Sequence, residues 1–212
     1  MFGDMSQSDQ SVSAYQLHIV LGRTSPHLWR RVLVRSDSTL HQLHQTIQAL
    51  FGWSDIHPHR FVFRSGRFLG ASPAAAISSL PAADLPLAEL QLQLKEKFFY
   101  HYRFHDPHTP VWRHQLRLEK ILVADRDAYP TCLGGVGSPP LEDTHSPREL
   151  TDLTELFTPQ FVLHRLTALI DQQATDAQLA QELRYLRPWL TADRFRRPPT
   201  ERRLRASLGG AP

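Results

Sequence analysis

Residues 15–52 read YQLHIVLGRTSPHLWRRVLVRSDSTLHQLHQTIQALFG, and this stretch decides the fold. Every second residue from Tyr15 to Leu21 is apolar or aromatic, which is the spacing of a strand with one buried face. A turn signal from Gly22 to Pro26 separates it from a second strand over residues 29–35. Two strands joined by a short turn predict a β-hairpin at the start of the domain.

The clearest helix follows over residues 40–51. Thr39 and Gln42 have the spacing of a capping box, and Gly52 supplies the stop. Aliphatic residues recur at helical spacing and predict a buried stripe: Leu40, Leu43, Ile47 and Leu50. Polar residues that we expect to face solvent lie on another face: His41, His44 and Gln48.

Further strand patterns follow this helix, and two helices close the chain. Residues 59–69 indicate two short strands, and residues 98–104 and 112–122 indicate a longer pair. The closing helices begin at Thr158-Pro159 and at Thr175. This order predicts an α+β protein: a mostly antiparallel sheet built from hairpins, one central helix, and two C-terminal helices, with a β-grasp-like layout as an option.

We expect three parts along the chain: a disordered N-terminus over residues 1–14, a single α+β domain over residues 15–190, and an Arg-rich flexible tail over residues 191–212. The longest apolar runs are far shorter than the ~20 residues that a membrane span needs. A single cysteine, Cys132, excludes an internal disulfide and fits a reducing compartment. The expected location is therefore cytoplasmic, without a membrane partner.

The positive charge is concentrated in residues 194–205, which hold six arginines and one glutamate, whereas the whole chain carries +3. Such a run can bind nucleic-acid phosphates by releasing counterions, and it can equally be a solvated tail. The candidate residues for nucleic-acid contact are Arg194, Arg196, Arg197, Arg202, Arg203 and Arg205.

Four motifs occur in order along the chain: Pro26-x-x-Trp29-Arg30-Arg31; Leu43-His44-x-x-Ile47-Gln48 with Gly52-Trp53 and His57-x-His59-x-Phe61; Tyr100-x-Tyr102-x-Phe104-x-Asp106 with Trp112-x-His114; and Tyr129-Pro130-x-Cys132-Leu133-x-Gly135 with Pro139-Pro140-x-Glu142-Asp143. Together they resemble the plasmid pRiA4b ORF-3-like family over roughly residues 15–170. Members of this family occur on plasmids and insertion elements and as free-standing proteins. The resemblance implies a fold and a shared site, but no reaction.

This chain departs from the family pattern at several positions. Arg103 stands where the family has an aspartate, and His105 where it has a glycine. Leu141 splits the proline-proline-glutamate-aspartate run, and Thr-His-Ser (144–146) replaces the glycines after it. An activity that depends on those positions in relatives would be lost or altered here.

A metal site is one hypothesis. His57 and His59 are two residues apart on an extended segment and so point to the same side. With Asp106 and His114 they could form a three-histidine or histidine-carboxylate site for zinc or manganese, which would activate a water for hydrolysis. The alternative is that these histidines are hydrogen-bonded residues of the core. This hypothesis describes a metal-assisted hydrolase or nuclease.

A non-catalytic binding module is the leading hypothesis. Its groove would engage nucleic acid or a protein partner, with tryptophan and tyrosine side chains as stacking platforms beside arginines, unless these aromatics only fill the core. An arginine that points inward needs a carboxylate partner. The residues expected around this pocket are Arg30, Arg31, Trp53, His57, His59, Tyr102, Asp106, Trp112, His114, Glu142 and Asp143.

Overall fold

The computed structural model describes residues 12–25, 27–64, 68–69, 84–104, 110–124, 129–142, 144, 146–190 and 194–208. Its centre is a seven-stranded sheet in the order β4-β3-β5-β6-β1-β2-β7, in which neighbouring strands are antiparallel. The strands are β1 (Ser13–Leu21), β2 (Leu28–Arg35), β3 (His59–Val62), β4 (Phe68–Leu69), β5 (Lys97–Phe104), β6 (Pro110–Val123) and β7 (Thr131–Val136). The predicted α+β class with a mostly antiparallel sheet is confirmed.

The predicted opening hairpin is present. β1 pairs with β2 from Ala14 opposite Arg35 to Leu21 opposite Leu28. Alternate residues of β2 are buried, from Leu28 through Val32 to Val34, because they face the helical layer. Ser13 and Ala14 belong to β1, so the disordered N-terminus predicted for residues 1–14 is too long at its end. The rest of that segment, residues 1–11, lies outside the described residues.

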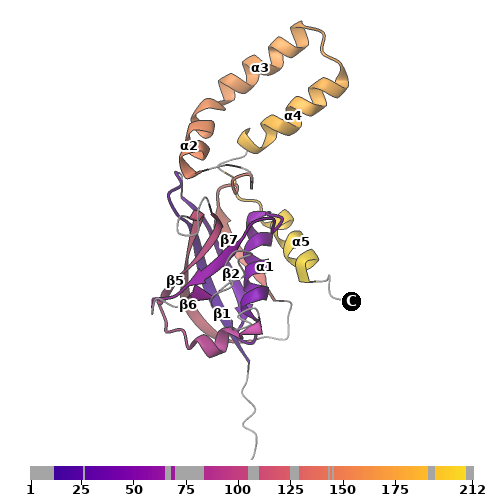
Figure 1. Ribbon diagram of the computed structural model, residues 1–212. Coiled ribbons are helices and arrows are strands. Elements are labelled where there is room, and N and C mark those ends of the chain that lie inside the picture. The colour runs from indigo at the N-terminus through magenta and orange to yellow at the C-terminus, as the bar shows by residue number, and fades with distance from the viewer. Residues whose placement is uncertain are drawn as a thin grey trace, which may run out of the picture.

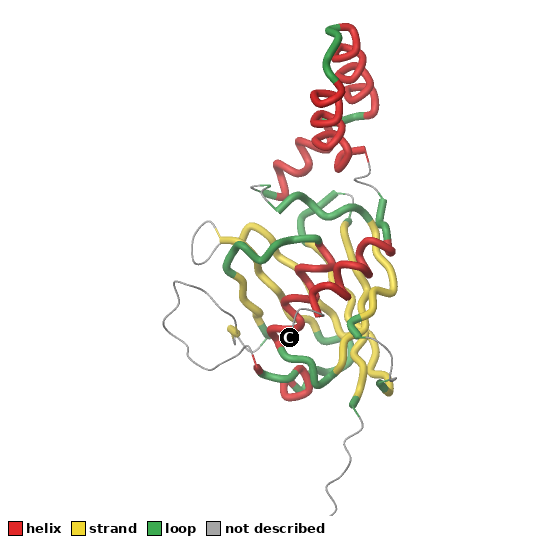
Figure 2. The backbone as a smooth tube through the Cα atoms, turned by 90° about the vertical axis from the view of Figure 1, so that its right-hand side faces the viewer, coloured by secondary structure: helices red, strands yellow, loops and turns green. Residues whose placement is uncertain are grey.

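Helix α1 (Leu40–Phe51) covers one face of the sheet, as Figure 2 shows. Its capping box is present: the Thr39 hydroxyl accepts from the Gln42 N–H at 3.2 Å, and the Gln42 side chain accepts from the Thr39 N–H at 2.9 Å. Gly52 ends the helix with φ 69°, the left-handed conformation that glycine adopts most easily. The predicted leucine and isoleucine stripe lies in the core.

The prediction that the polar face of α1 is solvated is wrong for two of its three residues. His44 is 0% exposed and Gln48 is 4% exposed, whereas His41 is exposed. The reason is that β5 presents Tyr100 to this face, and its hydroxyl lies 2.8 Å from both a His44 nitrogen and the Gln48 amide. The buried Tyr100 hydroxyl therefore replaces water as the partner of His44 and Gln48.

Three helices form an arm that extends away from the sheet in Figure 1: α2 (Pro147–Leu156), α3 (Pro159–Asp171) and α4 (Asp176–Leu190). The starts predicted for α3 and α4 are confirmed, including the Thr158 cap, which accepts from the Phe161 N–H at 3.2 Å. Helix α2 lies in a stretch for which no helix was predicted. The arm has its own small core around Phe157, Val162 and Leu186.

The last helix, α5 (Arg197–Leu208), corrects the prediction of a flexible tail for the residues it contains. It lies beside α1 on the same face of the sheet (Figures 1 and 2). Leu204 is 0% exposed within the main core, and Arg203 donates from Nε to the Ala49 carbonyl at 2.8 Å. One apolar anchor and one arginine bound to α1 thus hold a segment that its charge alone suggests is solvated.

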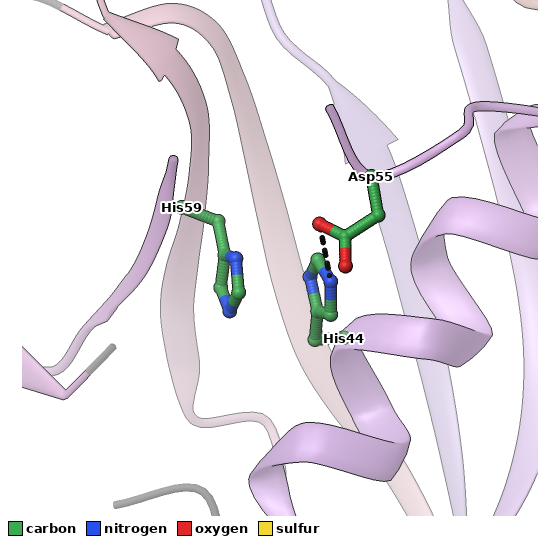
Figure 3. Close-up of side chains that lie close together, drawn as sticks. All are labelled: His44, Asp55 and His59. Carbon is green, nitrogen blue, oxygen red and sulfur yellow. Dashed lines mark ion pairs between the residues drawn. The ribbon is translucent and has the colours of Figure 1, made fainter. Parts of the chain in front are cut away.

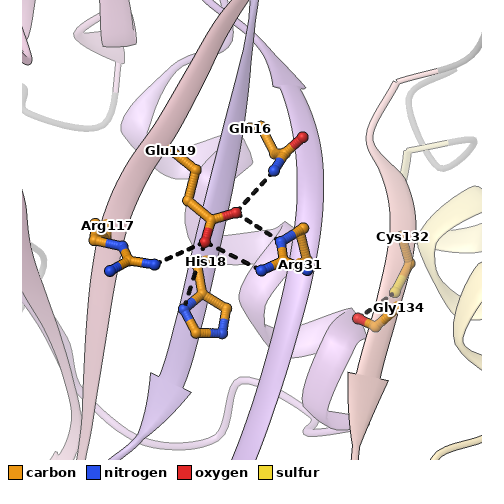
Figure 4. Close-up of polar contacts among 7 residues, drawn as sticks. All are labelled: Gln16, His18, Arg31, Arg117, Glu119, Cys132 and Gly134. Atoms are coloured by element: carbon orange, nitrogen blue, oxygen red, sulfur yellow. Dashed lines mark hydrogen bonds and ion pairs between the residues drawn. The ribbon is translucent and has the colours of Figure 1, made fainter. Parts of the chain in front are cut away.

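The opposite face of the sheet is polar. Glu119 of β6 accepts hydrogen bonds from Arg31 at 2.6 Å, Gln16 at 2.7 Å and Arg117 at 2.8 Å (Figure 4). The bond from Arg31 contributes most to lowering the pKa of Glu119 to about 2. This cluster ties β1, β2 and β6 together across the sheet. No helix in the described part of the chain combines the length and the apolarity needed to cross a membrane.

Candidate metal centre

Three side chains with metal-binding atoms meet between α1 and β3. His44 comes from α1, His59 is the first residue of β3, and Asp55 lies in the connection between them. One donor atom of each lies within 4.8 Å of the other two (Figure 3). The left-handed turn at Gly52 and a second one at Asp55, with φ 57°, return the chain so that the three residues converge.

The three donor residues lie close together, but their orientation is not that of a coordination shell. The His44 and His59 rings stack with centroids 3.6 Å apart and planes 9° from parallel. His44 Nε2 lies 2.8 Å from Asp55 Oδ1. Parallel imidazoles direct their nitrogen lone pairs in similar directions, so sharing one ion requires one ring to tilt. The carboxylate is the mobile partner, since the Asp55 side chain is 48% exposed.

Hydrogen bonds fix His44 from behind. Its Nδ1 lies 2.8 Å from the Tyr100 hydroxyl, which accepts from the Gln48 amide nitrogen at 2.8 Å. The Gln48 side-chain oxygen accepts in turn from the Asp55 N–H at 3.1 Å. Because Nδ1 is engaged by Tyr100, the Nε2 atom is the one directed toward Asp55 and His59. Metal-binding histidines have this kind of support on their second nitrogen.

Both imidazoles are neutral at pH 7, which is the form that binds metal. Burial lowers the pKa of His59 to about 3, with a further contribution from neighbouring His44. Burial also lowers the pKa of His44, although the carboxylate of Asp55 opposes this effect. Protons therefore compete with a metal at this site only in acid.

A pocket of about 390 Å³ opens beside the cluster. His44, Gln48 and Asp55 line one part of it, and Arg203 and Ser207 of α5 line another. Asp55 and His44 therefore border a cavity that has room for a ligand, whereas His59 is not among its lining residues. Helix α5 forms a wall of that cavity.

A second group of polar and aromatic side chains adjoins the cluster. The Tyr102 hydroxyl donates to Glu142 Oε1, and Glu142 Oε2 accepts from the Ser54 N–H at 2.7 Å. Trp53 stacks on Tyr102 with centroids 5.0 Å apart. Arg103 donates to the Glu142 carbonyl at 3.0 Å. Trp53, Tyr102 and Glu142, which the sequence assigned to one pocket, thus lie together.

Residues 13–161 match the family described as plasmid pRiA4b ORF-3-like protein. This chain belongs to the plasmid pRiA4b ORF-3-like family. The predicted resemblance is confirmed. The metal cluster lies inside the matched region, whereas α4 and α5 lie beyond it.

Two relatives place this pRiA4b ORF-3-like chain more closely. The uncharacterized protein y4hQ of Sinorhizobium fredii is 28% identical over 136 residues, which are 64% of this chain and 68% of the relative. The crystal structure of MM3350, a protein of unknown function from Methanosarcina mazei Go1, is similar with a TM-score of 0.58 and 28% identity. The region of similarity covers 69% of this chain and 82% of the MM3350 chain. Both support the family fold.

The structure brings together only part of the metal set predicted from the sequence. His59 belongs to the cluster of Figure 3. His57 lies at its edge, where its N–H donates to the Tyr102 hydroxyl at 3.3 Å. His114 is 0% exposed and packs against Phe51 and Tyr100.

The donor group found among the described residues therefore includes neither His57 nor His114. Asp106 and Asp143 lie outside the described residues. Trp112, the neighbouring aromatic of β6, is 0% exposed and belongs to the core.

The two arginines of the pRiA4b ORF-3-like hairpin motif have opposite positions. Arg31 lies on the polar face with Glu119, so it does not belong to the predicted pocket. Arg30 points inward and is 1% exposed. The prediction that it pairs with a carboxylate is wrong among the described residues. Its guanidinium instead donates to the carbonyls of Trp29, Leu50, Val136 and Gly137 at 2.7–3.4 Å.

Proposed function

We propose that this pRiA4b ORF-3-like protein is a metal-dependent hydrolase. Its metal site would consist of His44, Asp55 and His59. The observation that supports the proposal is the convergence of these donors from α1, β3 and their connection within 4.8 Å. Two neutral imidazoles and one carboxylate form a donor set that suits zinc and manganese.

The site leaves room for a water and a substrate. Three protein ligands fill three positions, and the pocket of about 390 Å³ gives access to the fourth. A divalent ion at such a site lowers the pKa of a bound water toward 7 and so makes a nucleophile available near neutral pH. Asp55, as the exposed ligand, would adjust its position as substrate enters.

Tyr100 and Gln48 would hold the ring of His44 in the orientation that the ion requires. Metal binding at Nε2 leaves the proton on Nδ1, which then donates to the Tyr100 hydroxyl 2.8 Å away. The Gln48 amide fixes that hydroxyl at 2.8 Å. These two residues are positioning residues, because they act by holding His44 and, in the case of Gln48, the backbone of Asp55.

Zinc and manganese titrations by calorimetry, with protein purified without a histidine tag, test the binding step. We expect one ion per chain, with affinity lost in His59→Ala and in Asp55→Asn. His41→Ala and His57→Ala are matched controls, since both histidines are near the site and outside the donor group. Equal losses in the controls, or no binding by the parent protein, would show that the site is not a metal centre.

Metal-dependent turnover of p-nitrophenyl acetate and bis-p-nitrophenyl phosphate tests the hydrolytic step. We expect turnover with the preferred ion that is abolished in Asp55→Asn. A protein that binds the ion with one-to-one stoichiometry but hydrolyses neither reagent above the rate of the free ion would retain the metal site and refute the hydrolase. The two steps of the proposal are therefore separable.

Nucleic-acid binding is a second candidate, favoured by exposed arginines within α5 and directly before it. Arg196, Arg202 and Arg205 are exposed, while Arg203 is bound to α1 and Arg197 lies 3.4 Å from Glu201. Replacing the three exposed arginines by glutamine should weaken duplex DNA binding and reduce the salt slope by up to about three. Unchanged binding and slope would exclude this surface.

A further inference from the structure

A second pocket, of about 280 Å³, lies near the start of α5. The loop over residues 137–142 forms one wall, and residues 194–203 form the other. Its charged lining is strongly basic and contains a single carboxylate: Arg30, Arg194, Arg196, Arg203 and Glu142. Several arginines in one cavity favour the binding of an anion.

Arg30 is the buried positive group of this pocket. Its side chain is 1% exposed, and Phe51 and Phe195 cover the two sides of the guanidinium, with ring centroids at 5.3 and 4.7 Å. Backbone carbonyls of Val136 and Gly137 accept from its terminal nitrogens at 2.8 Å. These contacts fix the orientation of the group, but dipoles do not cancel its full charge.

Arg203 brings a second positive charge to the same cavity. Its Nε donates to the Ala49 carbonyl at 2.8 Å, and its Nη2 donates to the Thr200 hydroxyl at 3.3 Å. In the described part of the chain, neither Arg203 nor Arg30 forms an ion pair. Burial lowers the pKa of Arg30 to about 10, and repulsion by the Arg203 guanidinium contributes to this shift. Both remain charged at pH 7.

Glu142 does not neutralise these arginines, although it lines the pocket. One of its carboxylate oxygens accepts from the Tyr102 hydroxyl, and the other accepts from the Ser54 N–H at 2.7 Å. Both oxygens are therefore directed toward the Tyr102 side of the loop. Glu142 therefore does not pair with Arg30 or Arg203.

We propose that this pocket binds the phosphate group of a small molecule. The guanidinium groups of Arg203 and Arg196 would donate to the phosphate oxygens. Four of the five N–H groups of Arg30 already donate to backbone carbonyls, so Arg30 would add positive charge to the pocket without contacting the phosphate. A volume of about 280 Å³ accommodates a phosphate with a small substituent.

The pocket is independent of the metal proposal. None of the three metal donors lines it, and Arg203 is the side chain that borders both cavities. Phosphate binding without metal would leave this inference standing alone. Zinc binding without phosphate affinity would do the reverse.

Calorimetric titration with inorganic phosphate and with pyrophosphate, at constant ionic strength set by chloride, tests the inference. We expect one-to-one binding that weakens at least tenfold in Arg203→Gln and also in Arg196→Gln. Arg205→Gln is the matched control, because this exposed arginine of α5 does not line the pocket. Far-UV circular dichroism checks that each variant is folded, and Arg196, being exposed, tolerates replacement.

Three outcomes would overturn the inference. The first is the absence of binding by the parent protein at millimolar phosphate and pyrophosphate. The second is an equal loss of affinity in Arg205→Gln, which would indicate general charge attraction by α5. A single-stranded oligonucleotide distinguishes the remaining source of phosphate: if it binds and pyrophosphate does not displace it, the arginines serve nucleic acid and the small-molecule pocket is refuted.

Discussion

Acidification should destabilise the protein through His114, and the magnitude follows from its burial. The ring is 0% exposed between Phe51, Trp53 and Tyr100, and neither ring nitrogen has a hydrogen-bond partner among the described residues. Burial lowers its pKa from 6.5 to about 3. Unfolding returns the imidazole to water and to its ordinary pKa.

The sign and size of the effect come from proton linkage. Between pH 6.5 and about 3, the unfolded chain holds a proton on this histidine and the folded chain does not. The stabilising contribution is therefore complete above pH 6.5 and decreases as the pH falls through that window. One pKa unit corresponds to about 1.4 kcal/mol, so at pH 5 the loss from His114 alone is about 2 kcal/mol.

Urea unfolding at pH 8 and at pH 5 measures this contribution. The parent protein should lose about 2 kcal/mol more between the two pH values than His114→Phe, whatever the stability of the variant at pH 8. His164→Gln, which removes an exposed histidine of α3, should leave the pH difference unchanged. Equal acid losses in the parent and in His114→Phe would refute a buried neutral imidazole at this position. His114→Leu repeats the test if the phenylalanine does not fit.

Four further measurements probe other contacts. Tyr100→Phe should cost about 2 kcal/mol in urea unfolding because it strands two buried polar groups, whereas Tyr15→Phe, whose hydroxyl has no hydrogen-bond partner in the described structure, should cost under about 0.5. Leu204→Ala should cost about 2–4 kcal/mol, and a change below about 0.5 would mean that α5 does not dock. Glu119→Gln should cost about 1 kcal/mol at pH 7, less in 1 M salt, and the difference should vanish as the pH falls from 4.5 toward 2. Zinc affinity should stay constant from pH 8 to 6, since the pKa of His59 is about 3; a tenfold loss would indicate an exposed site.

Much of the fold could be predicted from the sequence because local signals and burial agree there. Alternation over residues 15–21 and the capping box at Thr39 each have one physical interpretation, and both are present. The docking of α5 could not be predicted. Its arginines and prolines resemble a solvated tail, and only the position of Leu204 against α1 turns the segment into part of the core.

The sequence predicts only part of the proposed metal site. His59 was identified from its spacing with His57, but spacing alone could not show that His57 turns toward Tyr102. The leucine stripe of α1 predicts only one buried face, so His44 is expected to face solvent. The sequence does not show that β5 presents Tyr100 to the adjoining face. The signal that could have found His44 is its position next to that stripe, with Asp55 and His59 following a helix stop. Long-range packing decided the rest.

The two proposed sites differ in how they relate to the family. The metal donors lie between residues 44 and 59, within the region that matches the pRiA4b ORF-3-like family. The phosphate pocket combines Arg30 of that region with arginines from residues 194–203, which lie beyond it. A relative that contains only the matched region can therefore possess the metal site and not the phosphate pocket. Because α5 borders both cavities, this C-terminal helix is the element through which the present chain would select a substrate for the proposed metal site.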